Sequence, residues 1–423
     1  MVITMVDLTV LCNDEFNVLE KLKYNEQYDE KNHCVYSKCS QDELAESTDR
    51  KSRTKIKDYI DQLIDNGLIT HYSQNAKYQV TSLGNEVYRD LTEGRNQIKA
   101  SHYNCISLFA GVGGIDLGFK KAGFPTVYAN EFDGHAVTTY QENFNLQVDH
   151  RDIHEMVKDL ESGKDPFNGQ TFDILLAGFP CQAFSIAGYR EGFEDKKGRG
   201  GLFFEIMKIV KIKKPQVVFL ENVKNLVGHD HGKTFTIITD ALKSQGYHIQ
   251  YKVLNSMEYG NVPQNRERIY IVAFLDEEKS KEFHFPFPVP LTNTLEDVLD
   301  FHSQMTPNLY YTPATFSHYD EIKDIINKQD TVYQWRRVYV RENKSGVCPT
   351  LTANMGTGGH NVPLIYTDHG IRKLTPRECF LLQGYPKDYK LPPLANSHLY
   401  KQAGNSVSVT VIERIAKEIL RVL

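Results

Sequence analysis

The stretch FDILLAGFPCQ, residues 172–182, joins an apolar run to the tetrad Phe179-Pro180-Cys181-Gln182. Further along the chain a second apolar run, Val217 to Leu220, leads into Glu221-Asn222-Val223. Short apolar runs bounded by turn residues are typical of strands that are buried in a sheet. The sequence therefore predicts two strands, one ending beside a thiol and the other beside a carboxyl group.

Strand-like and helix-like segments alternate on both sides of this stretch, from Asn104 to about Phe274. Such alternation predicts an α/β fold, in which helices cover both faces of an open, mostly parallel sheet. The parallel arrangement would bring the two strand ends, with Cys181 and Glu221, to the same edge of the sheet.

A glycine-rich turn, Ser107-Leu-Phe-Ala-Gly-Val-Gly-Gly114, joins the first of these strands to a helix that begins near Ile115. Such a turn brings backbone amides close to a ligand. A dinucleotide site would require glycine at position 116, where this chain has Asp116, so pyrophosphate binding is disfavoured. Glu131 follows a second strand, Val127 to Ala129, where its carboxylate could accept hydrogen bonds from ribose hydroxyls. The sequence thus predicts a cofactor that contains a nucleoside.

Composition is that of an ordinary globular protein, because 40% of the 423 residues are hydrophobic and 24% are charged. This length allows two or three domains. No apolar run approaches the ~20 residues of a membrane span, and the amino terminus does not resemble a signal peptide. The seven cysteines lack paired spacings, which disfavours disulfides and a zinc site. We expect a cytoplasmic protein without a membrane segment or a metal.

The net charge of −5 argues mildly against a protein that coats nucleic acid. Local charge differs from this average, because two runs of basic residues stand out. The first comprises Arg50, Lys51, Arg53, Lys55 and Lys57, and the second, around Trp335, comprises Arg336, Arg337, Arg341 and Lys344. Each run is either a solvated face or a surface for phosphate groups.

Residues 1–95 are expected to form a separate module. A helix is predicted from Ser40, and a second from Ser52 to Asp65 on the helical spacing of its apolar residues. Two β-prone runs follow, 68–72 and 77–81. This order resembles a winged helix-turn-helix, with the first basic run at the start of the second helix. A small helical interaction domain is the alternative.

The composition changes again after the alternating region. Residues 276–366 are rich in Pro, Asn, Thr, Tyr and His and include a glycine-rich stretch, Met355 to His360, which predicts a loop-rich lobe. Residues 367–423 return to a helical pattern, from Arg372 onward, and are expected to pack back on the catalytic domain, residues 100–275.

The whole series of motifs from about Ile106 to the carboxyl terminus resembles the cytosine-5 DNA methyltransferase family. The resemblance implies a Rossmann-like fold that binds S-adenosylmethionine, with residues 276–366 as the target-recognition domain. It also implies that Phe132 stacks on the adenine, Asp152 accepts from the adenine amino group and Asn405 reaches the methionine end. The expected cofactor-binding residues are Phe109, Gly111, Gly113, Gly114, Glu131, Phe132, Asp152, Pro180 and Asn405.

The same resemblance assigns the chemistry to Cys181, Glu221, Arg266 and Arg268. A thiolate that adds to carbon 6 of cytosine breaks the aromaticity of the ring and makes carbon 5 nucleophilic. Glu221 would protonate the ring nitrogen, which requires a carboxyl whose pKa is raised by a poorly hydrated pocket. Arg268 would contact the base carbonyl and Arg266 would line the same pocket. Read without the family, Cys181 could be an inert buried thiol and Glu221 a surface carboxylate.

The target base must leave the DNA stack to meet the thiol and the cofactor together. The loop after Cys181 is glycine-rich and basic, and it either closes over DNA or remains a solvated loop. Thr350-Leu351 resembles a pair found in the family's recognition region. Candidate DNA-recognition residues are Arg336, Arg337, Arg341, Thr350, Leu351, Thr352 and Asn354, with GGNCC or GGWCC as the kind of target.

The interpretation that follows is a modification methyltransferase, monomeric on double-stranded DNA, that protects it from a cognate restriction endonuclease. One alternative is the tRNA-directed branch of the family, disfavoured by the long recognition lobe and by the missing Cys-Phe-Thr of that branch. The other is a DNA-binding regulator with an inactive methylase domain, which the presence of Cys181, Glu221, Arg266 and Arg268 disfavours.

Overall fold

The computed structural model describes residues 13–24, 26–29, 34–39, 41–46, 53–65, 69–73, 77–81, 101–180, 201–286, 288–289, 291–336, 339–356 and 362–423. The chain divides into two compact units. The smaller comprises residues 1–99 with 287–290, and the larger comprises residues 100–286 with 291–423.

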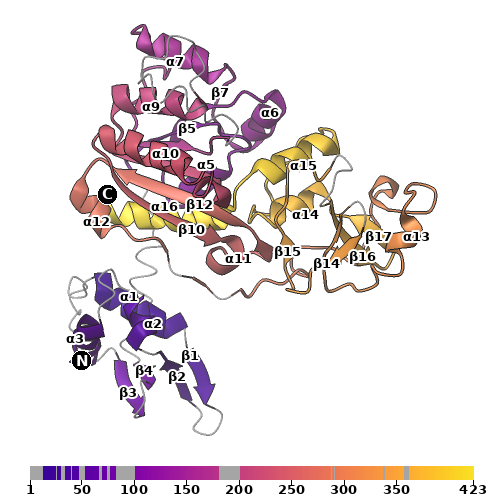
Figure 1. Cartoon of the computed structure of the whole chain (residues 1–423), viewed down its shortest axis with the longest axis horizontal. Coiled ribbons are helices and arrows are strands. Elements are labelled where there is room, and N and C mark those ends of the chain that lie inside the picture. The colour runs from indigo at the N-terminus through magenta and orange to yellow at the C-terminus, as the bar shows by residue number, and fades with distance from the viewer. Residues whose placement is uncertain are drawn as a thin grey trace, which may run out of the picture. The chain divides into compact units, whose positions relative to one another are not determined.

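A seven-stranded sheet organises the larger unit (Figure 1). Its order is β10-β12-β9-β8-β5-β6-β7, and the strands from β9 to β7 run parallel. β12 and β10 are antiparallel additions at one edge. The strands are β5 (Cys105–Leu108), β6 (Thr126–Asn130), β7 (Val148–Asp149), β8 (Ile174–Ala177), β9 (Val217–Val223), β10 (His248–Asn255) and β12 (Glu267–Phe274).

This mixed sheet confirms the α/β fold, and it also adds a feature that the sequence did not predict. β10 was missed because its middle is partly solvated, with Tyr251 and Lys252 exposed, so its apolar pattern is weak. The strands at the centre alternate between two cores: Leu175 and Ala177 face one, and Ile174 and Leu176 face the other.

Helices cover both faces of this sheet. α7 (Ile153–Glu161), α9 (Leu202–Lys213) and α10 (Lys233–Ser244) pack on one face, and α5 (Gly114–Lys121) and α16 (Val409–Val422) pack on the other (Figure 1). α16 buries residues at helical spacing, among them Ile412, Ile415 and Ile419. The carboxyl-terminal helix therefore completes one core of the seven-stranded sheet.

The remaining helices of the larger unit are shorter or lie beside the sheet. They are α6 (Gly134–Asn143), α11 (Ser256–Tyr259), α12 (Glu277–Glu282), α13 (Tyr319–Ile322), α14 (Pro376–Leu381), α15 (Asn396–Asn405) and the 3-10 turns η3 (Lys224–Leu226) and η4 (Pro307–Leu309). Among the described residues, none of the helices combines the length and the apolar character that crossing a bilayer would require.

Residues from the loop-rich region form a four-stranded antiparallel sheet, to one side of the catalytic sheet in Figure 1. Its order is β14-β13-β16-β17, with β14 (Val340–Glu342), β13 (Tyr333–Trp335), β16 (Val362–Thr367) and β17 (Gly370–Lys373). Its last strand, β17, lies beyond residue 366. A separate parallel pair, β11 (Gln264–Asn265) with β15 (Cys348–Pro349), joins the lobe to the strand that leads into β12.

The described residues of the smaller unit form their own apolar core, to which α1, α2, α3, β3 and β4 contribute. Its elements are α1 (Asn13–Tyr24), β1 (Glu26–Asp29), β2 (Cys34–Lys38), α2 (Gln41–Ala45), α3 (Arg53–Asp65), β3 (Ile69–Ser73) and β4 (Lys77–Val80). The sheet has the order β1-β2-β4-β3. The sequence predicts α2, α3, β3 and β4 but not α1 or the β1–β2 hairpin.

Candidate active site

The two strand ends singled out in the sequence are neighbours. β8 and β9 pair in parallel, with Ala177 opposite Leu220, so Gly178 to Pro180 follow β8 beside Glu221. The Asn222 side-chain Nδ2 donates a hydrogen bond to the Phe179 carbonyl at 2.9 Å and ties the two ends together. Cys181 is the next residue after Pro180, and it lies outside the described residues, as does the loop 182–200.

Glu221 is buried, with 8% of its surface exposed, which rules out the surface carboxylate as its role. Its Oε1 lies 3.4 Å from the Arg268 Nε, a charge contact in which Oε1 makes no hydrogen bond within the described structure. Burial raises the pKa of this carboxyl, and the positive charges of Arg268 and Arg266 oppose that rise only in part. The group is therefore suited to hold a proton and give it to a base nitrogen.

The two arginines predicted for this pocket have different surroundings. The Arg268 side chain lies beside Glu221, and its Nη1 donates to the Glu267 carbonyl at 2.8 Å. Arg266 is 1% exposed, and its Nη atoms donate to the carbonyls of Leu351, Gly404 and Ser406. Both residues line the same cavity, but the donors of Arg266 are largely committed to main-chain oxygens.

The glycine-rich turn begins at Phe109, which adopts a left-handed backbone conformation with φ 53°, as do Gly111 and Gly113. A side chain at Gly113 would collide with the ring of Phe144. The turn is fastened to the next strand, because the Gly111 amide donates to Glu131 Oε2 at 2.8 Å. The other oxygen, Oε1, accepts from the Asp133 amide at 2.7 Å. Glu131 thus sets the shape of the turn, and each carboxylate oxygen keeps a lone pair for a ligand.

Three further predicted cofactor residues surround the same space. Phe132 is 69% exposed and lines the large cavity. Asp152 caps α7, with its Oδ1 accepting from the His154 amide at 2.8 Å. Asn405 is exposed at the end of α15.

One cavity of about 820 Å³ connects all of these groups. This volume falls within the range of ~300–1,000 Å³ that is usual for cofactor sites. The lining includes every described residue that the sequence assigned to catalysis or to the cofactor, apart from the buried Gly113: Phe109, Gly111, Gly114, Glu131, Phe132, Asp152, Pro180, Glu221, Arg266, Arg268 and Asn405. The residues therefore fit a nucleoside cofactor and a base side by side.

A set of buried hydroxyl groups supports the turn from beneath, and sequence reasoning missed it. Asp116 accepts from Ser107 Oγ at 2.8 Å and from Tyr140 OH at 3.0 Å. Tyr389 OH donates to the Val112 carbonyl, inside the turn. The only signal in the sequence was Asp116 in place of a glycine, which does not reveal its partners.

The candidate DNA-recognition residues divide into exposed and enclosed groups. Arg336 and Arg341 belong to the β13–β14 hairpin and its turn, and Arg341 is exposed. Arg336 Nη2 donates to Gln334 Oε1 at 3.1 Å. Arg337 lies outside the described residues. The exposed Tyr339 of the same hairpin, 55% accessible, was not predicted as a contact.

The other four recognition candidates follow β15. Leu351 is 2% exposed, and its amide donates to Gln264 Oε1 at 3.1 Å, so its side chain does not face outward as a base contact would. Thr350 Oγ1 donates to the Asn265 carbonyl at 2.6 Å. Thr352 Oγ1 donates to Asn354 Oδ1 at 2.8 Å, and Asn354 is exposed.

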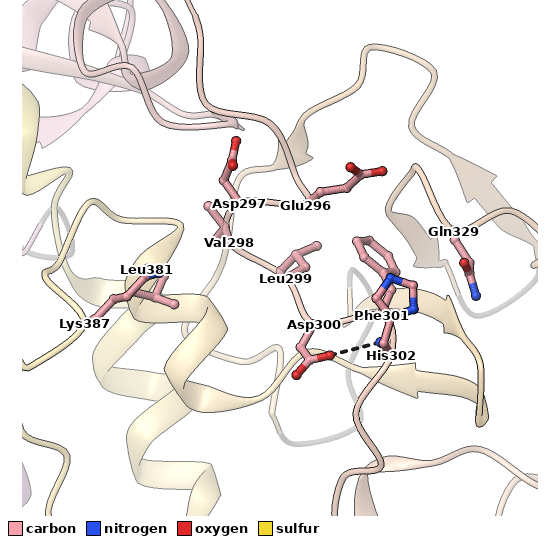
Figure 2. Close-up of a pocket in the computed structure, with 10 residues that line it drawn as sticks. All are labelled: Glu296, Asp297, Val298, Leu299, Asp300, Phe301, His302, Gln329, Leu381 and Lys387. Atoms are coloured by element: carbon pink, nitrogen blue, oxygen red, sulfur yellow. Dashed lines mark hydrogen bonds between the residues drawn. The ribbon is translucent and has the colours of Figure 1, made fainter.

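A second cavity, of about 450 Å³, lies between residues 296–302 and the side chains of Gln329, Leu381 and Lys387 (Figure 2). Two of its carboxylates accept hydrogen bonds from nearby backbone amides. Asp300 Oδ1 accepts from the His302 amide at 2.9 Å, and Asp297 Oδ2 accepts from the Thr294 amide at 2.7 Å. This cavity shares no lining residue with the larger one.

Residues 103–421 match the protein family described as C-5 cytosine-specific DNA methylase. Type II methyltransferase M.Bsp6I of Bacillus sp. (strain RFL6) is 59% identical over 317 residues, which is 74% of this chain and 98% of the relative. Type II methyltransferase M.HhaI of Haemophilus parahaemolyticus is 38% identical over 328 residues, covering 74% of this chain and 93% of its own.

Solved structures resemble the larger unit in fold. The methyltransferase EhMeth of Entamoeba histolytica has a TM-score of 0.56 at 17% identity, over 76% of this chain and 98% of its own. A putative DNA modification methyltransferase encoded within an E. coli prophage has a TM-score of 0.53 at 22% identity, over 76% and 99% of the two chains. These likenesses support the methyltransferase fold.

Proposed function

Since this chain belongs to the C-5 cytosine-specific DNA methylase family, we propose that it is the modification enzyme of a restriction-modification system. As a member of that family it transfers a methyl group from S-adenosylmethionine to carbon 5 of cytosine in DNA. We also propose that the enzyme acts on a short, specific double-stranded DNA sequence and so protects that sequence from a cognate endonuclease. The type II names of its relatives support this role.

The observation that carries the proposed mechanism is the single cavity shared by Glu221 and the glycine-rich turn. A cytosine rotated out of the duplex would enter it with its ring nitrogen toward Glu221. In that position Oε1 gains the hydrogen bond that it lacks, and Arg268, beside it, contacts the base carbonyl. The buried carboxyl supplies the proton as the Cys181 thiolate adds to carbon 6.

S-adenosylmethionine supplies an electrophilic methyl group at this site. Glu131 would accept from the ribose hydroxyls with the lone pairs that its two amide donors leave unused. The exposed ring of Phe132 would stack on the adenine, and Asp152 would accept from the adenine amino group through the oxygen that does not cap α7. Asn405, exposed beside the cavity, would reach the methionine end.

Once carbon 5 holds the methyl group and S-adenosylhomocysteine has been left behind, water takes the proton from carbon 5 and the Cys181 sulfur departs from carbon 6 as a thiolate. Glu221 takes back the proton of the ring nitrogen, which restores the neutral aromatic ring. A 5-fluorocytosine in the target position has no removable proton on carbon 5, so the covalent bond between enzyme and DNA should persist. We expect a denaturant-stable complex with the unaltered chain and S-adenosylmethionine, and none with Cys181→Ser. Absence of the complex from the unaltered chain would overturn the covalent mechanism.

The nucleic acid that is methylated can be identified directly. The full chain is incubated with tritiated S-adenosylmethionine and, separately, duplex DNA or tRNA. Label in DNA alone is the expected result, whereas label in tRNA alone would favour the tRNA-directed branch, and no label would favour a regulator without activity. Bisulfite mapping of DNA from an expressing host then gives the target, for which we propose the GGNCC or GGWCC kind.

We further propose that the smaller unit is a winged helix-turn-helix that binds DNA. α2 and α3 follow each other, a two-stranded wing β3–β4 comes next, and Lys57 is exposed on α3, in the basic run of residues 50–57. A mobility-shift assay with the gene's own upstream region tests this. We also expect the enzyme to act as a monomer on DNA in the cytoplasm.

A further inference from the structure

Arg266 occupies the point where three segments of the larger unit meet. It lies between β11 and β12, and β11 pairs with β15, which leads into residues 350–356, here called the recognition segment. Residues 404–406, here called the cofactor turn, form the end of α15 and contain Asn405. On its other side, β12 continues to Arg268, which contacts Glu221.

The contacts of Arg266 are unusual for a buried cation. Nη1 donates to the Leu351 carbonyl at 3.0 Å, and Nη2 donates to the Gly404 carbonyl at 3.2 Å and to the Ser406 carbonyl. No carboxylate accepts from it within the described structure, and its Nε has no hydrogen-bond partner there. Burying a guanidinium with neutral acceptors alone is costly, and burial lowers its pKa to about 9. A group retained at such cost has a task that a neutral side chain would not perform.

The two segments that Arg266 joins also touch directly. A side chain at Gly404 would collide with the backbone of Thr352 and Ala353, and a side chain at Gly356 would collide with the Tyr400 ring of α15. Gln264 fastens the recognition segment to a third point, the end of α14, because its Oε1 accepts from the Leu351 amide at 3.1 Å and its Nε2 donates to the Leu382 carbonyl at 2.6 Å. A shift of either segment would therefore strain the other.

We propose that Arg266 is a positioning residue that locks the recognition segment to the cofactor turn, so that cofactor binding and DNA docking strengthen each other. It holds three carbonyls in one arrangement: those of Gly404 and Ser406, on either side of Asn405, and that of Leu351. Coupling of this kind is reciprocal by thermodynamic necessity. The inference rests on the proposed function, in which Asn405 contacts the cofactor and the lobe beyond Leu351 contacts DNA.

Amide hydrogen exchange of the full chain tests the lock without knowledge of the DNA target. S-adenosylhomocysteine, which binds the cofactor site and does not react, is the probe. In the unaltered chain at saturation it should slow exchange in residues 350–356 by about tenfold. Arg266→Met, saturated with the same probe, should slow it less than about twofold. Arg266→Lys keeps the charge but reaches fewer carbonyls, so it should give an intermediate value and serves if the methionine variant does not fold.

Arg268→Lys is the matched control, because Arg268 pairs with Glu221 and does not contact the recognition segment. It should lower kcat while leaving the probe-induced protection of residues 350–356 intact. Equal protection in the unaltered chain and both Arg266 variants would overturn the lock. A binding isotherm of S-adenosylhomocysteine with the unaltered chain tests the proposed function separately. If the unaltered chain does not bind S-adenosylhomocysteine, the proposed function fails, whatever the exchange data show.

Discussion

At the scale of single residues, the chemistry depends on a carboxyl group kept away from water. Glu221 lies near the end of β9, opposite Tyr270 of β12 and just past the last residue paired with β8, and burial raises its pKa. Glu221→Gln keeps the shape of the side chain and removes the transferable proton. We expect kcat to fall by about 10²–10⁴-fold with little change in S-adenosylhomocysteine affinity. Rapid-quench single-turnover kinetics measure the rate of methyl transfer, and calorimetry measures the affinity for S-adenosylhomocysteine.

The same carboxyl makes stability depend on pH. Its folded pKa lies above its unfolded value of about 4.3, so between the two the folded state binds more protons and stability falls as pH rises. The free energy of unfolding of the unaltered chain, relative to Glu221→Gln, should therefore decline above about pH 4.3. Urea melts of both chains at a series of pH values measure this difference. A difference that grows with pH would contradict the raised pKa.

Tyr389 offers a test of the glycine-rich turn. Its hydroxyl donates to the Val112 carbonyl, whereas the buried Tyr247 makes the same kind of bond to the Pro215 carbonyl, and neither residue lines the large cavity. Each Tyr→Phe change should lower stability by about 0.5–1.5 kcal/mol. Only Tyr389→Phe should weaken S-adenosylhomocysteine binding, because only it frees the turn. Equal affinity for both variants in calorimetry would show that the turn needs no such support.

The sequence predicts those residues whose role depends on their place along one strand or turn. Glu221 and the glycine turn are of this kind, since a strand end and a tight loop are local features. Arg266 differs, because its acceptors lie 85 to 140 positions away along the chain. A side chain that bonds to main-chain carbonyls leaves no complementary residue in the sequence, so its partners could not be predicted.

At the scale of elements, the carboxyl-terminal return depends on one buried ion pair. Arg372 of β17 and Glu378 of α14 are 0% and 5% exposed in their side chains and are 2.7 Å apart. Glu378 also accepts from the Thr375 and Asp300 amides. Glu378→Gln leaves a buried guanidinium without a charge partner, and we expect a loss of about 3–5 kcal/mol in a urea melt. Lys281→Met, which removes two exposed ion pairs on α12, should give no measurable change.

The β13–β14 hairpin is the element on which direct base reading can be tested. Arg336 is held by the Gln334 side chain, while Arg341 is exposed on the facing strand, opposite Gln334. Arg336→Ala should weaken DNA binding by about 1–3 kcal/mol and relax the base preference at one position of the target sequence, as expected for a residue that reads a base. Arg341→Ala should weaken all sequences alike and reduce the salt dependence. Binding to a library of duplexes at two salt concentrations distinguishes the two roles.

Elements were predictable where their apolar periodicity was strong. The strands β8 and β9 and the helix α3 were expected close to their observed bounds. β13 to β17 are short and depend on pairing between distant segments, such as Trp335 with Val362, so local sequence carried little signal. The β1–β2 hairpin was missed for a similar reason, since its strands are four and five residues long.

At the scale of the whole molecule, the chain combines a complete methyltransferase with an additional unit. The family match starts at residue 103, and the match to M.Bsp6I covers 98% of that relative, so methyl transfer in this family does not require a counterpart of residues 1–99. A second DNA-binding unit on the same chain would raise the local concentration of DNA near the catalytic site. It would contribute through phosphate contacts, which weaken steeply with salt.

Removal of residues 1–99 tests this arrangement. We expect the truncated chain to keep the single-turnover rate of the full chain at saturating DNA, because the cavity is formed wholly by the larger unit. The apparent Kd for DNA should rise, and the dependence of log Kd on log salt should become shallower, since fewer phosphates are contacted. Unchanged Kd and salt slope would mean that the smaller unit does not bind DNA and would favour a protein-interaction domain. A lost single-turnover rate in a truncated chain that still binds S-adenosylhomocysteine would instead make the smaller unit part of the catalytic apparatus.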